Sequence, residues 1–292
     1  MDDRAPLRLT APAKLNLCLY LGPRREDGLH ELCSLFEPLE LADRLEVGEA
    51  GHDEVLCPGV AGENLAARAL AALRESGWNA PPLRVEIEKR IPVAAGLGGG
   101  SADAAAVLRL ARGAFLPDSA RKAPRADLAA IAAALGADVP SQLAPAFALV
   151  RGAGERVEPL PTPDPHAVVL LPGGGGLSTA EVFAEADRRG LGRDAAELEE
   201  LAGRLRAAAG AGASPLDYAS LLVNDLDPAA RALRPEIGAA LDALRAVGAP
   251  HAVLSGSGPT AVGLFPTIAR ARSAAAQIDR ADAIACEAGL VP

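Results

Sequence analysis

The stretch PVAAGLGGGSADAA, residues 92–105, holds the residues whose types and spacing are best suited to chemistry. Four of the five residues from Gly96 to Gly100 are glycine, and Ser101 follows at once. The free N–H groups and the positive dipole end of a helix N-terminus attract phosphate, and glycines let the backbone approach phosphate oxygens closely. The loop follows an expected strand, VEIEKRIP, and opens an alanine-rich helix. This context indicates an anion site.

Two familiar phosphate-binding patterns do not match this loop. The P-loop G-x-x-x-x-G-K-[ST] requires a lysine, and no lysine follows these glycines. The dinucleotide fingerprint requires a final glycine or alanine where, counted from Gly96, this chain has Ser101. A glycine-rich turn that serves tight packing alone is the alternative interpretation.

Lysine is rare in this chain, which makes each lysine informative. Lys14, Lys89 and Lys122 are the lysines among 29 basic residues, so a retained lysine can mark a place that needs a compact ammonium. Lys14 stands among alternating apolar residues, where a core-facing lysine needs a partner. A lysine on the wet face of a strand is the alternative. Asp138, in LGADVP, follows Gly136 and has the pattern of a helix N-cap.

The bulk composition excludes several classes of protein. The 292 residues carry a net charge of −9, which argues against a nucleic-acid binder that relies on a broad basic face. No apolar stretch nears the ~18 residues of a membrane span, and the start MDDRAPLRLT has no signal-peptide pattern. The four cysteines and four histidines are scattered, so we expect no metal-binding residues and free thiols in a reducing cytoplasm.

Strands and helices alternate through both halves of the chain. In the first half we expect a strand pair or bent strand at 7–22, strands at 39–47 and 82–92, and helices at 63–77, 101–115 and 126–144. Four prolines in residues 159–166 indicate a boundary between domains 1–158 and 159–292. In the second half we expect a strand at 166–173, helical segments at 178–190, 194–212, 235–249 and 266–280, and a strand–turn–strand unit at 251–265. This order indicates two α+β domains.

Three stretches, in order, resemble the motifs of the GHMP kinases, the family of galactose, homoserine, mevalonate and phosphomevalonate kinases. They are APAKLNL (11–17), the glycine loop, and LSGSGPTAVGLF (254–265). The resemblance implies an N-terminal domain like ribosomal protein S5 domain 2, a ferredoxin-like C-terminal domain, and an active site between them. DGLHEL, LGADVP and STAEVF resemble the members that use ATP to phosphorylate the 2-hydroxyl of 4-diphosphocytidyl-2-C-methyl-D-erythritol in the non-mevalonate isoprenoid pathway.

The resemblance also implies roles for matching residues. Asp138 would take the proton from the substrate hydroxyl, and Lys14 would pair with Asp138 and orient that hydroxyl. ATP would meet the loop and two further positions: Pro92, Ala94, Ala95, Gly96, Leu97, Gly98, Gly99, Gly100, Ser101, Ala102, Asn64 and Lys89. The substrate would meet Asn16 and His30 at its cytidine end, with Leu29, Phe183, Ser255 and Gly256. Mg²⁺ would accompany ATP, held mainly by its phosphates.

Several of these residues have simpler interpretations. Phe183 could be a core residue of its helix, His30 structural, Asn64 a helix N-cap and Lys89 a surface lysine, and SGSG could be an ordinary hairpin turn. Asp103 is either a metal ligand or a carboxylate favoured by the first turn of its helix. The expected protein is a cytoplasmic monomer or weak homodimer with a small-molecule substrate.

Two departures leave the substrate open. Family members usually read DGYH, with the tyrosine ring packed on cytosine, where this chain has Leu29. In SQLAPAFALV the family more often has a Phe-Phe pair and a glycine. A GHMP kinase acting on another small alcohol, of the homoserine or mevalonate type, is therefore one alternative. A nucleotide-binding protein that does not catalyse is the other.

Overall fold

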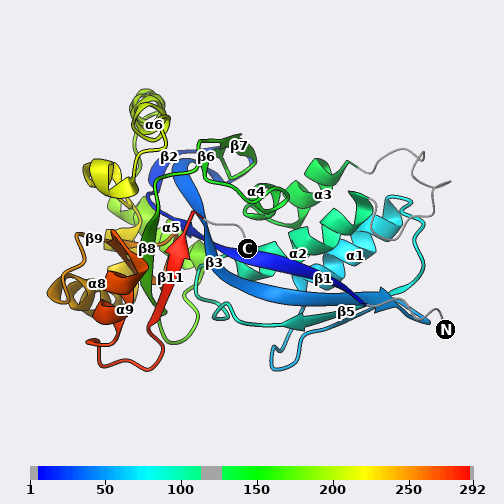
Figure 1. Cartoon of the computed structure of the whole chain (residues 1–292). Coiled ribbons are helices and arrows are strands. Elements are labelled where there is room, and N and C mark those ends of the chain that lie inside the picture. The colour runs from blue at the N-terminus through cyan, green and yellow to red at the C-terminus, as the bar shows by residue number, and fades with distance from the viewer. Residues whose placement is uncertain (1–5, 113–126, 290–292) are drawn as a thin grey trace.

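The computed structural model describes residues 6–112 and 127–289, and Figure 1 shows two halves side by side. One half is built on a mostly antiparallel sheet, with β4 parallel to β5, and some of its strands alternate apolar and polar residues. In β5, for example, Leu83, Val85 and Ile87 are buried and the residues between them are exposed. The strands of this half are β1 (Leu7–Asn16), β2 (Tyr20–Arg24), β3 (His30–Glu49), β4 (Glu54–Leu56), β5 (Leu83–Glu88), β6 (Ala148–Gly152) and β7 (Arg156–Pro159).

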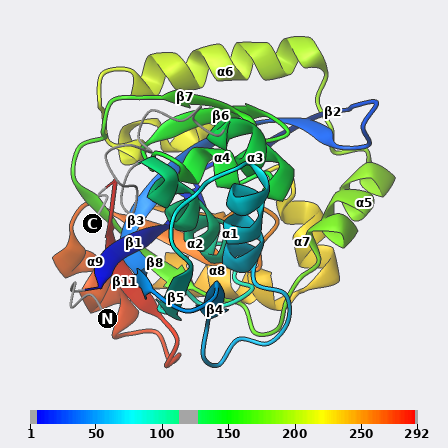
Figure 2. The same ribbon diagram turned by 90° about the vertical axis from the view of Figure 1, so that its right-hand side faces the viewer.

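Helices cover one face of this sheet. Their alanine and leucine side chains form a core with Leu45, Val47, Val85 and Ile87 of the strands. Figure 2 shows α1 and α2 side by side on this face. The helices are α1 (Leu65–Glu75), α2 (Gly99–Arg109), α3 (Leu128–Leu135) and α4 (Val139–Gln142).

The second half has a smaller sheet with helices packed against it. Its strands run in the order β11–β8–β10–β9, all antiparallel, and β11 joins them to β3 through the pair Ala288–Leu39. The strands are β8 (His166–Leu171), β9 (His251–Leu254), β10 (Ala261–Phe265) and β11 (Ile284–Ala288). The helices are α5 (Thr179–Arg189), α6 (Ala195–Ala209), α7 (Asp227–Leu233), α8 (Glu236–Ala246) and α9 (Ile268–Ala275).

The expected elements are found, with three corrections. The strand expected at 39–47 is the end of the 20-residue β3, which begins at His30. The helix expected at 126–144 is two helices, because the chain leaves the helical conformation at Gly136, the C-cap of α3. The α-helix expected to reach residue 115 ends at Arg109 and continues as a 3₁₀ turn to Arg112. Residues 113–115, 126 and Lys122 lie outside the described residues.

The expected domain boundary at 159–166 falls between β7 and β8. The division into residues 1–158 and 159–292 stays a prediction, since β11 returns from the second half to pair with β3. Within the described part of the chain, no helix combines the length and the apolar character that crossing a membrane requires.

Candidate active site

Two cavities meet at the glycine loop. The first, which we call the loop cavity, has a volume of about 330 Å³ and is lined by residues 92–101 together with Asn64, Lys89 and Asp103. The second, which we call the cleft, has a volume of about 760 Å³ and lies between the two halves. Both cavities are lined by Gly96, Gly98 and Ser101. A ligand in one cavity can therefore touch a ligand in the other at this loop.

At three loop glycines a side chain would meet neighbouring atoms closely, whereas at Gly100 a side chain would meet open space. A Cβ on Gly96 would lie 2.4 Å from the carbonyl oxygen of Gly258, and a Cβ on Gly98 would lie 2.9 Å from Cγ of Lys14. A Cβ on Gly99 would lie 3.1 Å from the Nζ atom of Lys89. A Cβ on Gly100 would meet nothing within 4 Å. Packing alone therefore explains part of this glycine cluster but not Gly100, which lines the loop cavity.

The loop delivers a free helix N-terminus to the loop cavity. Gly98 is the N-cap of α2 in the left-handed conformation, and no side chain caps the helix. The first N–H groups of α2 are thus left for a ligand. On its other side the loop is held by the N–H of Lys14, which donates to the carbonyl of Leu97 at 3.0 Å. Thr260, from the third motif, donates its hydroxyl to the carbonyl of Ala95 at 2.6 Å.

Lys14 and Asp138 meet in the cleft. The Nζ atom of Lys14 lies 3.1 Å from Oδ2 of Asp138 and donates to Oδ1 of Asn16 at 2.8 Å. The same Nζ lies 4.6 Å from the centroid of the Phe36 ring. The side chain of Lys14 is 7% exposed, so the alternative of a lysine on a wet strand face is wrong. Asp138 holds the N-cap position of α4, yet its side chain makes no capping bond and faces Lys14 instead.

A buried network fixes the Lys14 end of the cleft. The amide Nδ2 of Asn16 donates to Oγ of Ser34 at 2.8 Å, and Ser34 donates to the carbonyl of Cys18. The backbone N–H of Asn16 donates to Oγ of Ser255 at 3.0 Å. The structure places Asn16 in the lining of the cleft beside Lys14, and its expected contact with the cytidine end of a substrate stays a prediction. Ser255 is fully buried, so it supports Asn16, while the neighbouring Gly256 lines the cleft.

His30 and Phe183 form an aromatic wall elsewhere in the cleft. Their ring centroids are 5.4 Å apart with an interplanar angle of 38°. Nε2 of His30 lies 2.8 Å from Oδ1 of Asp187. Phe183 packs against a core cluster and also lines the cleft, so it is compatible both with a core role and with a contact to a ligand. Leu29 also lines the cleft and is 54% exposed.

Sequence reasoning missed four polar residues that line the cleft, namely Arg24, Thr179, Asp187 and Ser257. Thr179, at the start of α5, and Ser257, in the third motif, have hydroxyl oxygens 2.9 Å apart. Asp187 and Arg24 flank the aromatic wall. The repeated glycine and serine of SGSG could have signalled Ser257, whereas the other three carry no local signal and depend on how the strands and helices pair.

Lys89 is held between two buried carboxylates at the edge of the loop cavity. Its Nζ contacts Oδ2 of Asp43 and lies 2.8 Å from Oδ2 of Asp103, so the surface-lysine alternative is wrong. Burial raises the pKa of Asp103 to about 7, against the opposing effect of the Lys89 charge. Asn64 both caps α1, accepting from Ala66 N–H at 2.8 Å, and lines the loop cavity. Ala102 is fully buried, so its methyl group faces the core.

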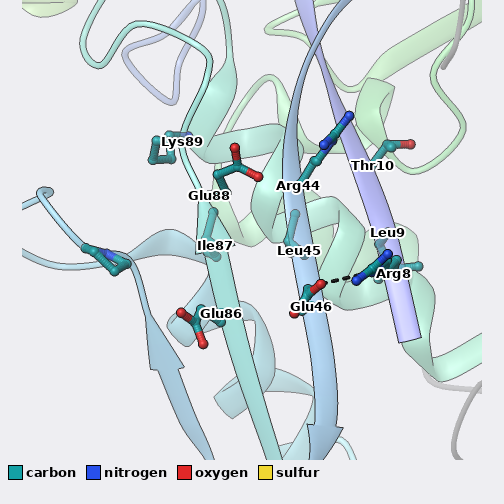
Figure 3. Close-up of a pocket in the computed structure, with 11 residues that line it drawn as sticks. Arg8, Leu9, Thr10, Arg44, Leu45, Glu46, Glu86, Ile87, Glu88 and Lys89 are labelled. Carbon is teal, nitrogen blue, oxygen red and sulfur yellow. Dashed lines mark hydrogen bonds and ion pairs between the residues drawn. The ribbon is translucent and has the colours of Figure 1, made fainter. Parts of the chain in front are cut away.

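A third hollow, of about 840 Å³, lies on the open face of β1, β3 and β5 (Figure 3). Charged side chains line these strands, namely Arg8, Arg44, Glu46, Glu86 and Glu88, and Nε of Arg8 donates to Oε1 of Glu46 at 2.9 Å. Lys89 lines this hollow as well as the loop cavity. None of the other residues predicted for the site lines it, so its size alone does not make it a candidate active site.

Comparisons with known proteins agree with this geometry. The pattern of the GHMP kinases N terminal domain matches residues 64–149, and that of the GHMP kinases C terminal domain matches residues 188–284. This chain belongs to the GHMP kinase family. The predicted GHMP kinase fold is confirmed, since the chain overlays a crystal structure of 4-(cytidine 5'-diphospho)-2C-methyl-D-erythritol kinase with a TM-score of 0.78. The two are 37% identical, with 98% of this chain and 100% of that one covered.

Relatives narrow the place of this GHMP kinase within the family. It is 42% identical to the 4-diphosphocytidyl-2-C-methyl-D-erythritol kinase of Anaeromyxobacter dehalogenans (strain 2CP-C), over 92% of this chain and 83% of that protein. It is also 42% identical to the enzyme of that name from Thermobifida fusca (strain YX), over 95% and 93%. A homoserine kinase structure from Cytophaga hutchinsonii is 17% identical, with a TM-score of 0.66 and coverage of 100% and 96%, and shares the fold alone.

Proposed function

We propose that this GHMP kinase transfers the γ-phosphoryl group of ATP to the 2-hydroxyl of 4-diphosphocytidyl-2-C-methyl-D-erythritol. The observation that carries the proposal is the meeting of two cavities at Gly96, Gly98 and Ser101, with the Lys14–Asp138 pair on the cleft side. The relatives and the overlaid structure that bear the name of this kinase support the same substrate.

The chemistry follows from the positions of the two charged side chains. As the substrate hydroxyl oxygen bonds to the γ-phosphorus, the bond from that phosphorus to the β,γ-bridging oxygen breaks, and the hydroxyl proton passes to Asp138. An ammonium has three donors, and Lys14 uses one on Asn16 and one on Asp138. The third donor is free to meet the hydroxyl or a γ-phosphate oxygen. Phosphoryl transfer depends mainly on such positioning and charge neutralisation.

The nucleotide occupies the loop cavity in this proposal. The uncapped N–H groups of α2 point to the β- and γ-phosphates, and Gly100 leaves room for them. Asn64 and Lys89 line the same cavity and face the rest of the nucleotide.

Mg²⁺ is proposed to arrive with the phosphates of ATP. Among the described residues there is no group of three or more histidine, cysteine or acidic side chains that could hold a metal ion. Asp103 lines the loop cavity with one oxygen, Oδ2, paired with Lys89 and the other, Oδ1, buried without a hydrogen-bond partner in the described part of the chain, so it could supply at most one oxygen to the ion. Mg²⁺ neutralises phosphate charge when it is bound, and we assign no step to it beyond that.

The cleft has the right lining for an elongated substrate. With the reacting hydroxyl at Lys14 and Asp138, the cytosine is placed against the His30–Phe183 wall, and Gly256, Ser257 and Thr179 face the part between. Thr179 and Ser257 bring hydroxyl donors there, and α5 begins at Thr179. A diphosphate is the part of the substrate that these donors suit.

The test is ATP turnover with Mg²⁺ and the diphosphocytidyl substrate, run beside homoserine and mevalonate, with ADP release as the readout. We expect turnover with the cytidine compound alone. Turnover with another alcohol and none with the cytidine compound would overturn the substrate and preserve the kinase mechanism. Absence of transfer to every alcohol would favour a nucleotide-binding protein that does not catalyse. Gel filtration at several concentrations tests the expected monomer or weak homodimer.

A further inference from the structure

Arg24 stands directly across a strand pair from His30. β2 and β3 are antiparallel, and Arg24 and His30 are register partners at the end of the hairpin that the turn of residues 25–29 joins. Residues directly opposite each other in antiparallel strands carry their side chains on the same face, with Cβ atoms about 5 Å apart. Both residues line the cleft, together with Leu29. The guanidinium of Arg24 therefore belongs to the same wall as the His30–Phe183 ring pair.

The charge of Arg24 is unused within the described part of the chain. Its Nε donates to the carbonyl of Gly28 at 3.2 Å, and no carboxylate there lies within ion-pair distance of it. Its neighbour Arg25 differs, since it contacts Asp27, Glu31 and Glu155 at 3.1, 3.5 and 2.9 Å. Arg25 thus stabilises the hairpin through its ion pairs. The Nη groups and the planar face of the Arg24 guanidinium are available to a ligand.

The surroundings of Arg24 suit a flat heterocycle better than a phosphate. Two aromatic rings and the exposed Leu29 lie on this part of the cleft. The carboxylate of Asp187 is held there by His30, and it would repel a phosphate. Bases are commonly recognised by stacking on aromatic rings and on arginine guanidinium planes. Arginine offers such a plane and lysine does not.

We infer that Arg24 is a specificity-determining residue whose guanidinium plane lies against the pyrimidine ring of the substrate. The inference rests on the proposed function, because it takes the cytidine end of the substrate to occupy the His30–Phe183 wall. Arg24 would then complete a pocket for the base that Phe183 and His30 form in part.

Cytidine, which carries no phosphate, tests this contact directly. Its affinity for the wild type, Arg24→Ala, Arg24→Lys and the hairpin control Arg25→Ala is measured by calorimetry, beside inhibition of turnover by pyrophosphate. We expect Arg24→Ala and Arg24→Lys each to weaken cytidine binding and to raise the KM of the cytidine substrate about tenfold, a typical loss for one stacking partner. The kcat, the KM for ATP and the inhibition by pyrophosphate should stay within about twofold to threefold.

Four outcomes would overturn the inference in different ways. Unchanged cytidine affinity with weakened pyrophosphate inhibition would place Arg24 on the phosphates. An equal loss in Arg25→Ala would mean that both substitutions act by disordering the hairpin. Failure of the wild type to bind cytidine and to phosphorylate the cytidine substrate would overturn the proposed function together with the inference. Wild-type binding and turnover with an unaffected Arg24→Ala would overturn the inference alone.

Discussion

Replacing Lys14 by methionine should abolish most turnover and leave ATP binding intact. Methionine is close to lysine in length and keeps the apolar contacts of the stem, while the ammonium on Asp138 and Asn16 is lost. The ammonium is almost wholly shielded from water, so no solvent cation replaces it. The helix N-terminus that we propose for the phosphates of ATP contains no part of Lys14, so we expect the KM for ATP to change by less than about threefold.

The size of the effect on kcat can be estimated from the loss of comparable hydrogen-bond donors in other enzymes. Loss of one preorganised donor that faces developing charge costs about 10²–10³ in kcat, and loss of a charged one on a phosphoryl group costs about 10³–10⁵. Lys14 is a charged donor that also positions the proposed base, so we expect kcat to fall about 10³-fold, which is ~4 kcal/mol of activation free energy.

The assay is steady-state ADP release with the diphosphocytidyl substrate, with thermal unfolding to confirm that the variant is folded. Arg8→Met is the matched control, because Arg8 is an exposed cation that pairs with Glu46 on the open sheet face and lines neither the loop cavity nor the cleft. That variant should keep wild-type kcat. A Lys14→Met enzyme that retains more than about a tenth of wild-type kcat would refute the reasoning. So would one in which only the KM for ATP changes.

Two further predictions concern the loop cavity. Gly98→Ala should lower the free energy of unfolding by about 1–3 kcal/mol, because Gly98 has a φ of +70° and its new Cβ would meet Lys14. Gly100→Ala should leave the free energy of unfolding unchanged, because Gly100 has free space around it and an ordinary φ. Equal melting temperatures for the two variants would contradict this prediction. The pKa of Asp103 is raised by burial to about 7 in the folded state against about 3.9 when unfolded, so between pH 4 and 7 the folded state keeps a proton that the unfolded chain has lost. Stability should therefore lose this contribution as pH rises through that window, and the contribution should be absent in Asp103→Asn, which chemical denaturation at several pH values measures; an unchanged slope in the variant would count against this role of Asp103.

Much of the fold could be predicted because the sequence repeats the period of each element. Alternating apolar residues indicate β5, and the N-cap residues Ser178 and Asp194 indicate the starts of α5 and α6. β3 could not be predicted in full, because residues 33–39 are buried on both faces and so lose the period of two. β11 is five residues long and depends on its neighbours β8 and β3 for its existence.

The site residues also fall into those that a local pattern predicts and those that only the fold brings together. The rarity of lysine drew attention to Lys14 and Lys89, and the glycine loop marked a phosphate site. The partner of Lys14 lies 124 residues away along the chain, and Asp43 lies 46 residues from Lys89, so no local pattern could pair them. Arg24 was missed for a similar reason, since its place in the cleft depends on the register of β2 against β3.

The long strand β3 also sets a limit on how this chain can evolve. His30 of the aromatic wall, Phe36 beside Lys14, and Asp43 beside Lys89 all belong to it, and the first and last are 13 residues apart, about 43 Å of extended chain. The spacing between the cleft and the loop cavity is therefore set by residues of one strand, whose pairing with β1 shifts register between Pro38 and Ala42. A single inserted residue that no bulge absorbed would turn every later side chain to the opposite face. Surface loops of this enzyme can gain and lose residues over time, but this strand has to keep its length.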